Sequence, residues 1–302
     1  MTTTQTANQY DIRDPRNAYP QPPFPRQPQE APGLAAKMDP QPDHGEKSYQ
    51  GLGRMKGRKA LITGGDSGIG RAVAIAYMRE GASVAINYLE EEQQDVQSLL
   101  DLAEREGGTI IPMPGNLMDE DFCTSLVKNA AEQMGGLDAL VINAGKQVMQ
   151  QSIQDITTEQ FDQTLKTNCY AMFWLSKAAL QLMPPGSTII NVTSVVGFKP
   201  PTALLDYAST KFFIRGFTEA LAPQALEKGI RVNGVAPGPF WTPLQPSGGQ
   251  SQDNLEQFGT SVPMGRPGQP AEIASTFVFL ATQESGFTTG EIIGVTGGAP
   301  IS

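Results

Sequence analysis

Two side chains that could exchange a proton, Tyr207 and Lys211, stand four residues apart in the segment DYASTK. In a helix this spacing puts both on one face, where the ammonium favours a phenolate over a neutral phenol. Lowering a tyrosine pKa from about 10 to about 7 takes about 4 kcal/mol, more than one partly solvated lysine supplies. A second positive charge is therefore expected nearby. Taken alone, a tyrosine and a lysine at this spacing usually lie on a solvated helix face and have no chemical role.

A glycine-rich turn lies far upstream of this pair. The letters TGGDSGIG, residues 63–70, follow the strand-like run KALIT and open a helical pattern. Glycines in this context let a phosphate-bearing ligand approach backbone amides at the positive end of a helix. An ordinary tight strand-to-helix connection is the alternative.

Small and polar residues end two further strand-like runs. Asn143, Ala144 and Gly145 end the fourth run, and Ser194 ends the fifth. Open parallel sheets bind ligands at the carboxyl ends of their strands, so these residues are candidates for a shared crevice. A strand-terminating turn and a capping serine are the plain structural alternatives.

The elements that must position these residues follow an alternating pattern. From Arg58 onward, short β-branched runs such as KALIT, SVAINY and STIINVTS alternate with longer amphipathic stretches, including long helix-like ones at about 158–183 and 206–228. Such alternation predicts βαβ units and a parallel sheet. We expect one α/β domain over residues 51–302, with a Rossmann-type, doubly wound, seven-stranded parallel sheet covered by helices on both faces.

Residues 1–50 differ in composition and are predicted to form an extended, proline-rich N-terminal arm. The stretch AYPQPPFPRQPQEAPG, residues 18–33, favours polyproline II over packed structure. A flexible linker is one interpretation of the arm. An ordered strap over its own or a neighbouring subunit is the other, since Tyr10, Tyr19, Phe24 and Met38 could each fill a surface groove.

Composition excludes several classes of function. The 302 residues include 22 basic and 31 acidic ones, a net charge of −9, which argues against nucleic-acid or anionic membrane surfaces. No apolar run reaches the length of a membrane span, and the start lacks the features of a signal peptide, so we expect a soluble, cytoplasmic protein. We therefore expect the protein to act on small molecules.

The cysteines and the histidine narrow the chemistry further. Cys123 and Cys169 are far apart and outside any CxxC spacing, so neither a disulfide framework nor a metal site is expected. His44 is the only histidine and lies in the arm. A serine hydrolase built on Ser67 of GGDSG, a third hypothesis, would need a histidine to take the serine proton, and we expect no labelling of Ser67 by a phosphonate.

In this order, TGGDSGIG, NAG, Asn168, Ser194, YASTK and the Pro237–Gly238 pair resemble the short-chain dehydrogenase/reductase family over about residues 56–298. The resemblance implies hydride transfer between a nicotinamide cofactor and a carbonyl/alcohol pair, with Tyr207 as general acid/base. It further implies that Ser194 polarises the substrate oxygen, that Lys211 lowers the Tyr207 pKa and binds the ribose, and that Asn168 supports a proton-relay water. The cationic nicotinamide ring of the oxidised cofactor would supply the second positive charge that is expected near Tyr207.

The same resemblance implies which residues contact the cofactor. They are Gly64, Ser67, Gly68, Ile69, Gly70, Asn87, Tyr88, Asn116, Leu117, Asn143, Ala144, Gly145, Tyr207, Lys211, Pro237, Gly238 and Thr242. Three positions depart from the family pattern: Asn116 and Thr296 each stand where an aspartate is common, and INAG replaces NNAG. The long N-terminal extension and the passage PGPFWTPLQPSGGQ resemble a bacterial subgroup of general-stress-type oxidoreductases.

The second expected strand ends Asn87, Tyr88, Leu89, without the acidic residue that typically selects NAD by binding both ribose hydroxyls. We therefore expect NADP in preference to NAD, with Arg71 able to approach the 2′-phosphate. Glu90, Glu91 and Glu92 count against this expectation, although a solvated helix start explains them.

Residues 239–263 are rich in Gly, Pro, Ser and Gln and are predicted to form a lid over the substrate; a disordered surface loop is the alternative. The aromatic side chains of this segment suggest a partly apolar pocket, which does not distinguish an aldehyde, a ketone, a quinone or a sugar. A non-catalytic dinucleotide sensor on the same fold is the competing function. By family resemblance, the helices around Asn168 and Tyr207 would pack against a second subunit in a homodimer or homotetramer.

Overall fold

The computed structural model describes residues 8–301 and has a seven-stranded, all-parallel sheet at its centre. The strands are β1 (Lys59–Thr63), β2 (Ser83–Tyr88), β3 (Thr109–Pro114), β4 (Ala139–Ile142), β5 (Thr188–Val192), β6 (Arg231–Pro237) and β7 (Ile292–Val295). Their order is β3-β2-β1-β4-β5-β6-β7, so the direction of winding reverses between β1 and β4. The predicted doubly wound fold is confirmed.

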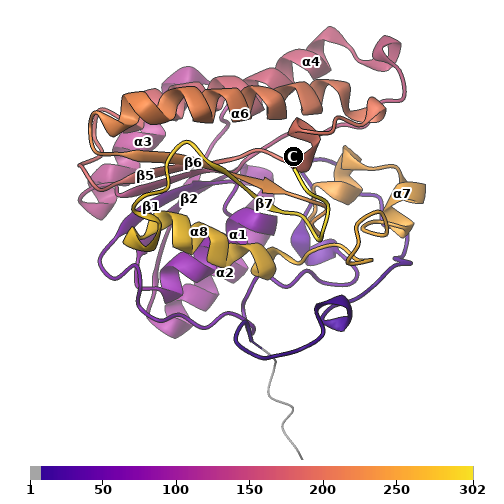
Figure 1. Ribbon diagram of the computed structural model, residues 1–302, viewed down its shortest axis with the longest axis horizontal. Coiled ribbons are helices and arrows are strands. Elements are labelled where there is room, and N and C mark those ends of the chain that lie inside the picture. The colour runs from indigo at the N-terminus through magenta and orange to yellow at the C-terminus, as the bar shows by residue number, and fades with distance from the viewer. Residues whose placement is uncertain (1–7, 302) are drawn as a thin grey trace, which may run out of the picture.

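Helices cover both faces of this sheet (Figure 1). On one face lie α1 (Gly68–Arg79), α2 (Gln93–Glu106) and α8 (Pro270–Ala281); on the other lie α3 (Glu120–Met134), α4 (Thr158–Leu165), α5 (Ala171–Ala179) and α6 (Leu205–Leu226). Because strand side chains alternate, Ala60 and Ile62 of β1 enter the first core, while Leu61 between them enters the second. The site must therefore lie at a strand end rather than within either core.

The long helix expected over residues 158–183 is interrupted. Between α4 and α5 the chain forms one π turn, Lys166–Tyr170, in which the amide of Ala171 donates to the carbonyl of Lys166 five residues earlier. The helix then ends at Ala179, ahead of Pro184 and Pro185. Single π turns recur at functional positions, and this one contains Asn168.

The described part of the N-terminal arm, residues 8–50, lies against the body of the molecule (Figure 1, indigo). Two of its four candidate side chains, Phe24 and Met38, are buried, whereas Tyr19 is half-buried and Tyr10 is exposed. Arg79 of α1 holds the arm's backbone, donating to the carbonyls of Gly45 and Tyr49 at 2.5 and 2.6 Å. In this structure the segment is an ordered strap and not a free linker.

Residues 239–263 are also ordered. They contain a π turn, Gln245–Gly249, and the short helix α7 (Gln252–Glu256). Trp241 and Leu255 of this segment are fully buried, and they share a small third core with Phe24 and Met38 of the arm. Among residues 8–301, no helix is both long enough and apolar enough to span a membrane.

Candidate active site

A cavity of about 990 Å³ opens at the carboxyl ends of the strands. It extends from the glycine turn after β1, past the ends of β2, β4 and β5, to the segment after β6. Every residue predicted to belong to the site lines this cavity, except Asn168 and Gly70. Residues from distant parts of the chain thus meet where an open parallel sheet binds ligands.

The glycine turn is shaped by close backbone packing. Gly64 has a φ of 61°, in the left-handed region. A Cβ on Gly70 would lie 1.8 Å from the carbonyl oxygen of Gly64, so no larger residue fits there. Gly70 therefore acts by letting α1 begin close to β1, not by touching the cavity.

Asn143 braces this turn from the neighbouring strand. Its side-chain amide donates to the carbonyls of Thr63 and Gly64 at 3.2 and 3.1 Å. In return, the Thr63 hydroxyl accepts from the backbone amides of Asn143 and Ala144 at 3.0 and 3.1 Å. The ends of β1 and β4 are thereby fixed relative to one another.

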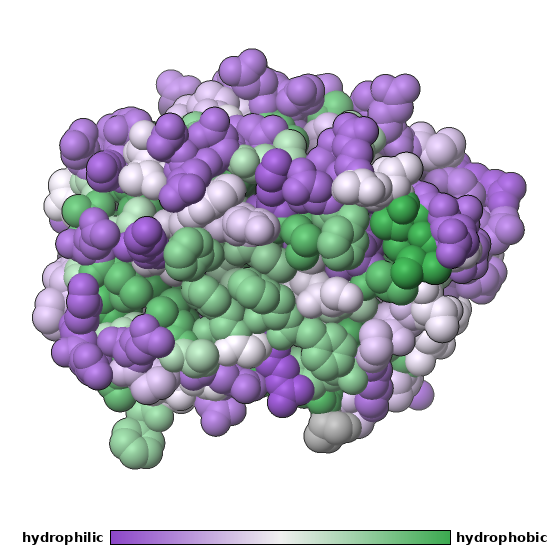
Figure 2. All heavy atoms as spheres, turned by 90° about the horizontal axis from the view of Figure 1, so that it is seen from above, coloured by the Kyte–Doolittle hydropathy of each residue, from purple (hydrophilic) through white to green (hydrophobic). Residues whose placement is uncertain are grey.

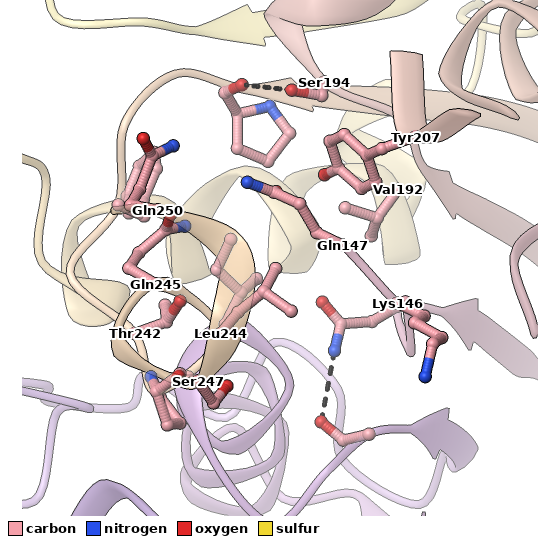
Figure 3. A pocket seen from close by; sticks show the side chains of 18 of the residues that line it. Lys146, Gln147, Val192, Ser194, Tyr207, Thr242, Leu244, Gln245, Ser247 and Gln250 are labelled. Carbon is pink, nitrogen blue, oxygen red and sulfur yellow. Dashed lines mark hydrogen bonds between the residues drawn. The ribbon is translucent and has the colours of Figure 1, made fainter. Parts of the chain in front are cut away.

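Ser194 and Tyr207 lie together on one wall of the cavity (Figure 3). Ser194 follows β5, and its hydroxyl lies 3.5 Å from the Pro237 carbonyl oxygen that it faces. Burial raises the pKa of Tyr207 above its ordinary value, and hydrogen bonding with the Ser194 hydroxyl offsets part of that rise. Burial thus favours the neutral phenol of Tyr207 over the phenolate.

Lys211 differs from the partly solvated lysine expected from the sequence, because it is buried. Its ammonium donates to the carbonyl of Val192 at 2.8 Å and lies 5.2 Å from the centre of the Tyr207 ring. Burial lowers the pKa of Lys211 to about 8. The lysine therefore titrates within the working range of many enzymes.

Asn168 lies behind the cavity wall and links two elements of the site. Its side-chain oxygen accepts from the amide of Lys146 at 2.7 Å, and its nitrogen donates to the Lys146 carbonyl and the Thr210 hydroxyl, both at 3.0 Å. Thr210 in turn donates to the carbonyl of Tyr207 at 2.7 Å. Asn168 thus connects the loop after β4 to the turn of α6 that carries Tyr207.

Arg71 does not reach the cavity, so the suggestion that it could meet a 2′-phosphate is wrong. Its guanidinium donates to the Asp95 carbonyl at 2.7 Å, to the Ser98 hydroxyl at 2.9 Å and to the Glu46 carboxylate at 3.0 Å, and it donates more weakly to the Asp66 carbonyl of the glycine turn at 3.3 Å. The first three partners are distant in sequence or on another helix. The position of Arg71 in the motif does not predict these hydrogen bonds to distant segments.

Three acidic side chains, Asp66, Glu91 and Glu92, line the cavity beside the glycine turn and the end of β2. Asp66 is buried, and burial raises its pKa to about 6. Burial and the nearby Asp66 raise the pKa of Glu92 to about 8. The interpretation of the three glutamates as a solvated helix start holds for Glu90 and Glu91, which are exposed, and is wrong for half-buried Glu92.

Amide side chains face the proposed proton-transfer group from the opposite wall. Figure 3 shows Gln245 and Gln250 across the cavity from Ser194 and Tyr207. The side-chain oxygen of Gln245 is buried without a hydrogen-bond partner among the described residues. The glutamines of segment 239–263 are the sequence signal for these amides, whereas the expectation of a partly apolar pocket rests on the aromatic residues of the segment.

Comparisons with known proteins agree with these observations. Residues 64–300 match the family model described as enoyl-(acyl carrier protein) reductase. General stress protein 39 of Bacillus subtilis is 45% identical over 267 residues, covering 88% of this chain and 93% of that protein. Glucose and ribitol dehydrogenase of Daucus carota is 41% identical over 285 residues, covering 92% and 98%. The predicted likeness to general-stress-type oxidoreductases is confirmed.

Among solved structures, a short chain dehydrogenase from Burkholderia cenocepacia J2315 in complex with NADP has a TM-score of 0.75 and 31% identity. The match covers 81% of this chain and 98% of that one. By its motifs, its relatives and its fold, this chain belongs to the short-chain dehydrogenase/reductase family and is an NAD(P)-dependent oxidoreductase.

Proposed function

We propose that the protein transfers a hydride between NADP, its preferred coenzyme, and a small carbonyl/alcohol substrate, with Tyr207 as general acid/base. The observation that carries this proposal is the meeting of Ser194, Tyr207 and Lys211 in the cavity that begins at the glycine turn. A nicotinamide coenzyme supplies the hydride or accepts it when bound.

In the oxidation direction, the Tyr207 phenolate takes the proton of the substrate hydroxyl as the carbon-bound hydride leaves for the coenzyme. Ser194 holds the substrate oxygen by hydrogen bonding. Lys211 favours the phenolate and binds the coenzyme's ribose hydroxyls. Asn168 fixes the turn of α6 that presents Tyr207 and supports a water that relays the proton.

The cavity fits a dinucleotide at its glycine end. The close approach of Gly70 to Gly64 keeps side chains away from the start of α1, where amides can bind a diphosphate. At the end of β4, a Cβ on Gly145 would meet its nearest neighbour, the side-chain oxygen of Asn168, only at 3.5 Å, so the glycine leaves room for a flat ring. We propose that the cofactor-contact residues named from the sequence line its path.

Two observations support NADP as the preferred coenzyme. The end of β2 carries Asn87 and Tyr88 and no acidic residue, and the structurally similar Burkholderia enzyme was solved with NADP. NAD is a second candidate, because Asp66 and Glu92 would repel a 2′-phosphate when charged. Initial rates with NADPH and NADH at matched substrate concentration decide between them through the ratio of kcat/KM.

We propose polyhydroxylated alcohols and sugars as the first substrates to test within the carbonyl/alcohol class. The carrot relative is a glucose and ribitol dehydrogenase. Gln245 and Gln250 present amides to the substrate side of the cavity, and amides can donate to and accept from hydroxyl groups. Simple aldehydes, ketones and quinones without extra hydroxyls are the comparison panel.

Replacing Tyr207 with Phe tests the mechanism. Turnover should fall by about 10²-fold or more, the scale of general acid/base catalysis, while NADPH affinity changes by less than about threefold. Stopped-flow hydride transfer and fluorescence titration with NADPH measure the two quantities. Unchanged turnover on every accepted substrate would remove Tyr207 from the reaction.

The two cysteines are free and buried, as suits a reducing compartment. We propose that the protein works in the cytoplasm, as a homodimer or homotetramer. Fractionation of the source cells tests the first part of this proposal.

A further inference from the structure

We propose that residues 24–43 of the N-terminal arm form a strap that holds segment 239–263, the lid, in its ordered shape. In this arrangement Phe24 and Trp241 are positioning residues for the cavity wall. The strap acts on the lid whichever substrate or coenzyme the enzyme prefers.

Three apolar side chains of the lid, Trp241, Leu255 and Phe258, share a core with the arm. Trp241 is fully buried, and its ring stacks on Phe24 with centroids 4.2 Å apart. Phe258 packs against the same tryptophan at 6.3 Å. Met38 completes this small core, which is separate from the two cores on the faces of the sheet. Without the arm, these lid side chains would be exposed to water.

Backbone and side-chain hydrogen bonds continue the contact along the lid. The indole nitrogen of Trp241 donates to the carbonyl of Pro40 at 2.8 Å. The amide of Phe24 donates to the carbonyl of Glu256 in α7 at 2.9 Å. The Ser247 hydroxyl donates to the carbonyl of Pro32 at 3.1 Å. The lid is thus held at its beginning, at its π turn and at its short helix.

The strap is itself fixed to the helices beside the coenzyme end of the cavity. The carboxylate of Asp95 in α2 accepts from the amides of Ala35 and Ala36 at 2.6 and 3.1 Å. Further along, Glu46 pairs with Arg71 of α1 at 3.0 Å. Since α1 begins at the glycine turn, the arm connects the phosphate-binding end of the site to the lid.

The strap also shapes the cavity. Pro32 and the neighbouring Ala31 contribute to its wall. Thr242, next to the stacked Trp241, lines the cavity and lies so near the glycine turn that a Cβ on Gly68 would meet it at 3.1 Å. A lid ordered in advance loses less conformational entropy when a ligand binds, so its contacts contribute more to affinity.

The variant Phe24→Ala tests the strap, with Tyr10→Ala as the matched aromatic control in the exposed part of the arm. Hydrogen–deuterium exchange of the ligand-free enzyme should be at least about tenfold faster across residues 241–258 in Phe24→Ala, while strands β1 and β4 keep the wild-type exchange rates. Saturation with NADPH should restore part of the protection. Tyr10→Ala should exchange as the wild type does.

Kinetics give a second measure that does not rely on exchange. In Phe24→Ala the KM for the best substrate of the panel should rise about tenfold, with kcat changed less than about threefold, because the chemical groups are intact. Trp241→Phe keeps an aromatic ring in this core but loses the indole donor to Pro40 and part of the buried ring, so it should show a change in the same direction. Wild-type lid exchange in both variants would overturn the proposal, whether or not the enzyme turns over.

Discussion

At the scale of single residues, the proton-transfer pair is not preformed as an ion pair. Burial raises the pKa of Tyr207 and lowers that of Lys211 to about 8, so the site favours the neutral form of both groups. A positive charge brought into the same cavity reverses this preference, since an opposite charge favours the phenolate. The oxidised coenzyme carries such a charge on its ring.

Binding of NADP⁺ at pH 8 should therefore release a fraction of a proton from Tyr207. Calorimetric titration in two buffers with different ionisation enthalpies measures the number released. The Tyr207→Phe variant should release fewer protons when NADP⁺ binds, because it lacks the phenol that ionises. Equal release from both proteins would mean that Tyr207 does not respond to the coenzyme's charge.

Asp66 permits a test of coenzyme choice by pH. Its pKa of about 6 means that the side chain becomes negatively charged as the pH rises from about 5 to about 7. Because this charge repels a 2′-phosphate, the preference for NADP over NAD should weaken over the same pH range. In Asp66→Asn, the ratio of kcat/KM for NADP to that for NAD should rise about tenfold at pH 7 and lose the part of the pH dependence centred near pH 6, while the part due to Glu92 remains. Asp101→Asn, an exposed change on α2, is the control.

At the scale of elements, the π turn between α4 and α5 places Asn168 between two segments that it joins. Asn168→Ala removes the partner of the Lys146 amide and of the Thr210 hydroxyl. We expect unfolding to become easier by about 1–3 kcal/mol, together with a fall in kcat. Urea denaturation measures the first effect. Gln163→Ala, which truncates an amide on the neighbouring helix, should change stability by less than about 0.5 kcal/mol.

The parallel sheet and the residues at its strand ends could be predicted because both depend on local patterns. Buried strands read as short β-branched runs, and the motif glycines lie where those runs stop. The π turn, the partners of Arg71 and the burial of Glu92 depend on contacts between distant segments. Phe24 and Trp241 show the same limit: the sequence suggests that Phe24 fills a surface groove and that Trp241, with the other aromatic residues of the lid, makes the pocket partly apolar, and only the fold pairs the two rings.

At the scale of the whole molecule, the helices that carry the site present an apolar outer face. Figure 2 shows apolar side chains gathered on the side of α4 and α6. The exposed large apolar residues of α4, of the π turn, of α5 and of α6 are Phe161, Tyr170, Phe173, Leu205, Phe212, Phe213 and Leu226. Monomeric proteins seldom expose so many neighbouring apolar side chains, so we propose that a second copy of the chain covers this face.

A charge placed in this face should separate the copies. Phe213→Glu puts a carboxylate where the proposed interface would bury it, and desolvation of that charge opposes association. Light scattering after size exclusion should show the wild type at two or four times the chain mass and the variant at a smaller multiple. Leu52→Glu, an equally abrupt change at an exposed position outside these helices, should keep the wild-type mass. Because α6 also carries Tyr207, the dissociated variant should lose turnover as well, whereas a wild-type mass for Phe213→Glu would assign the face to another partner.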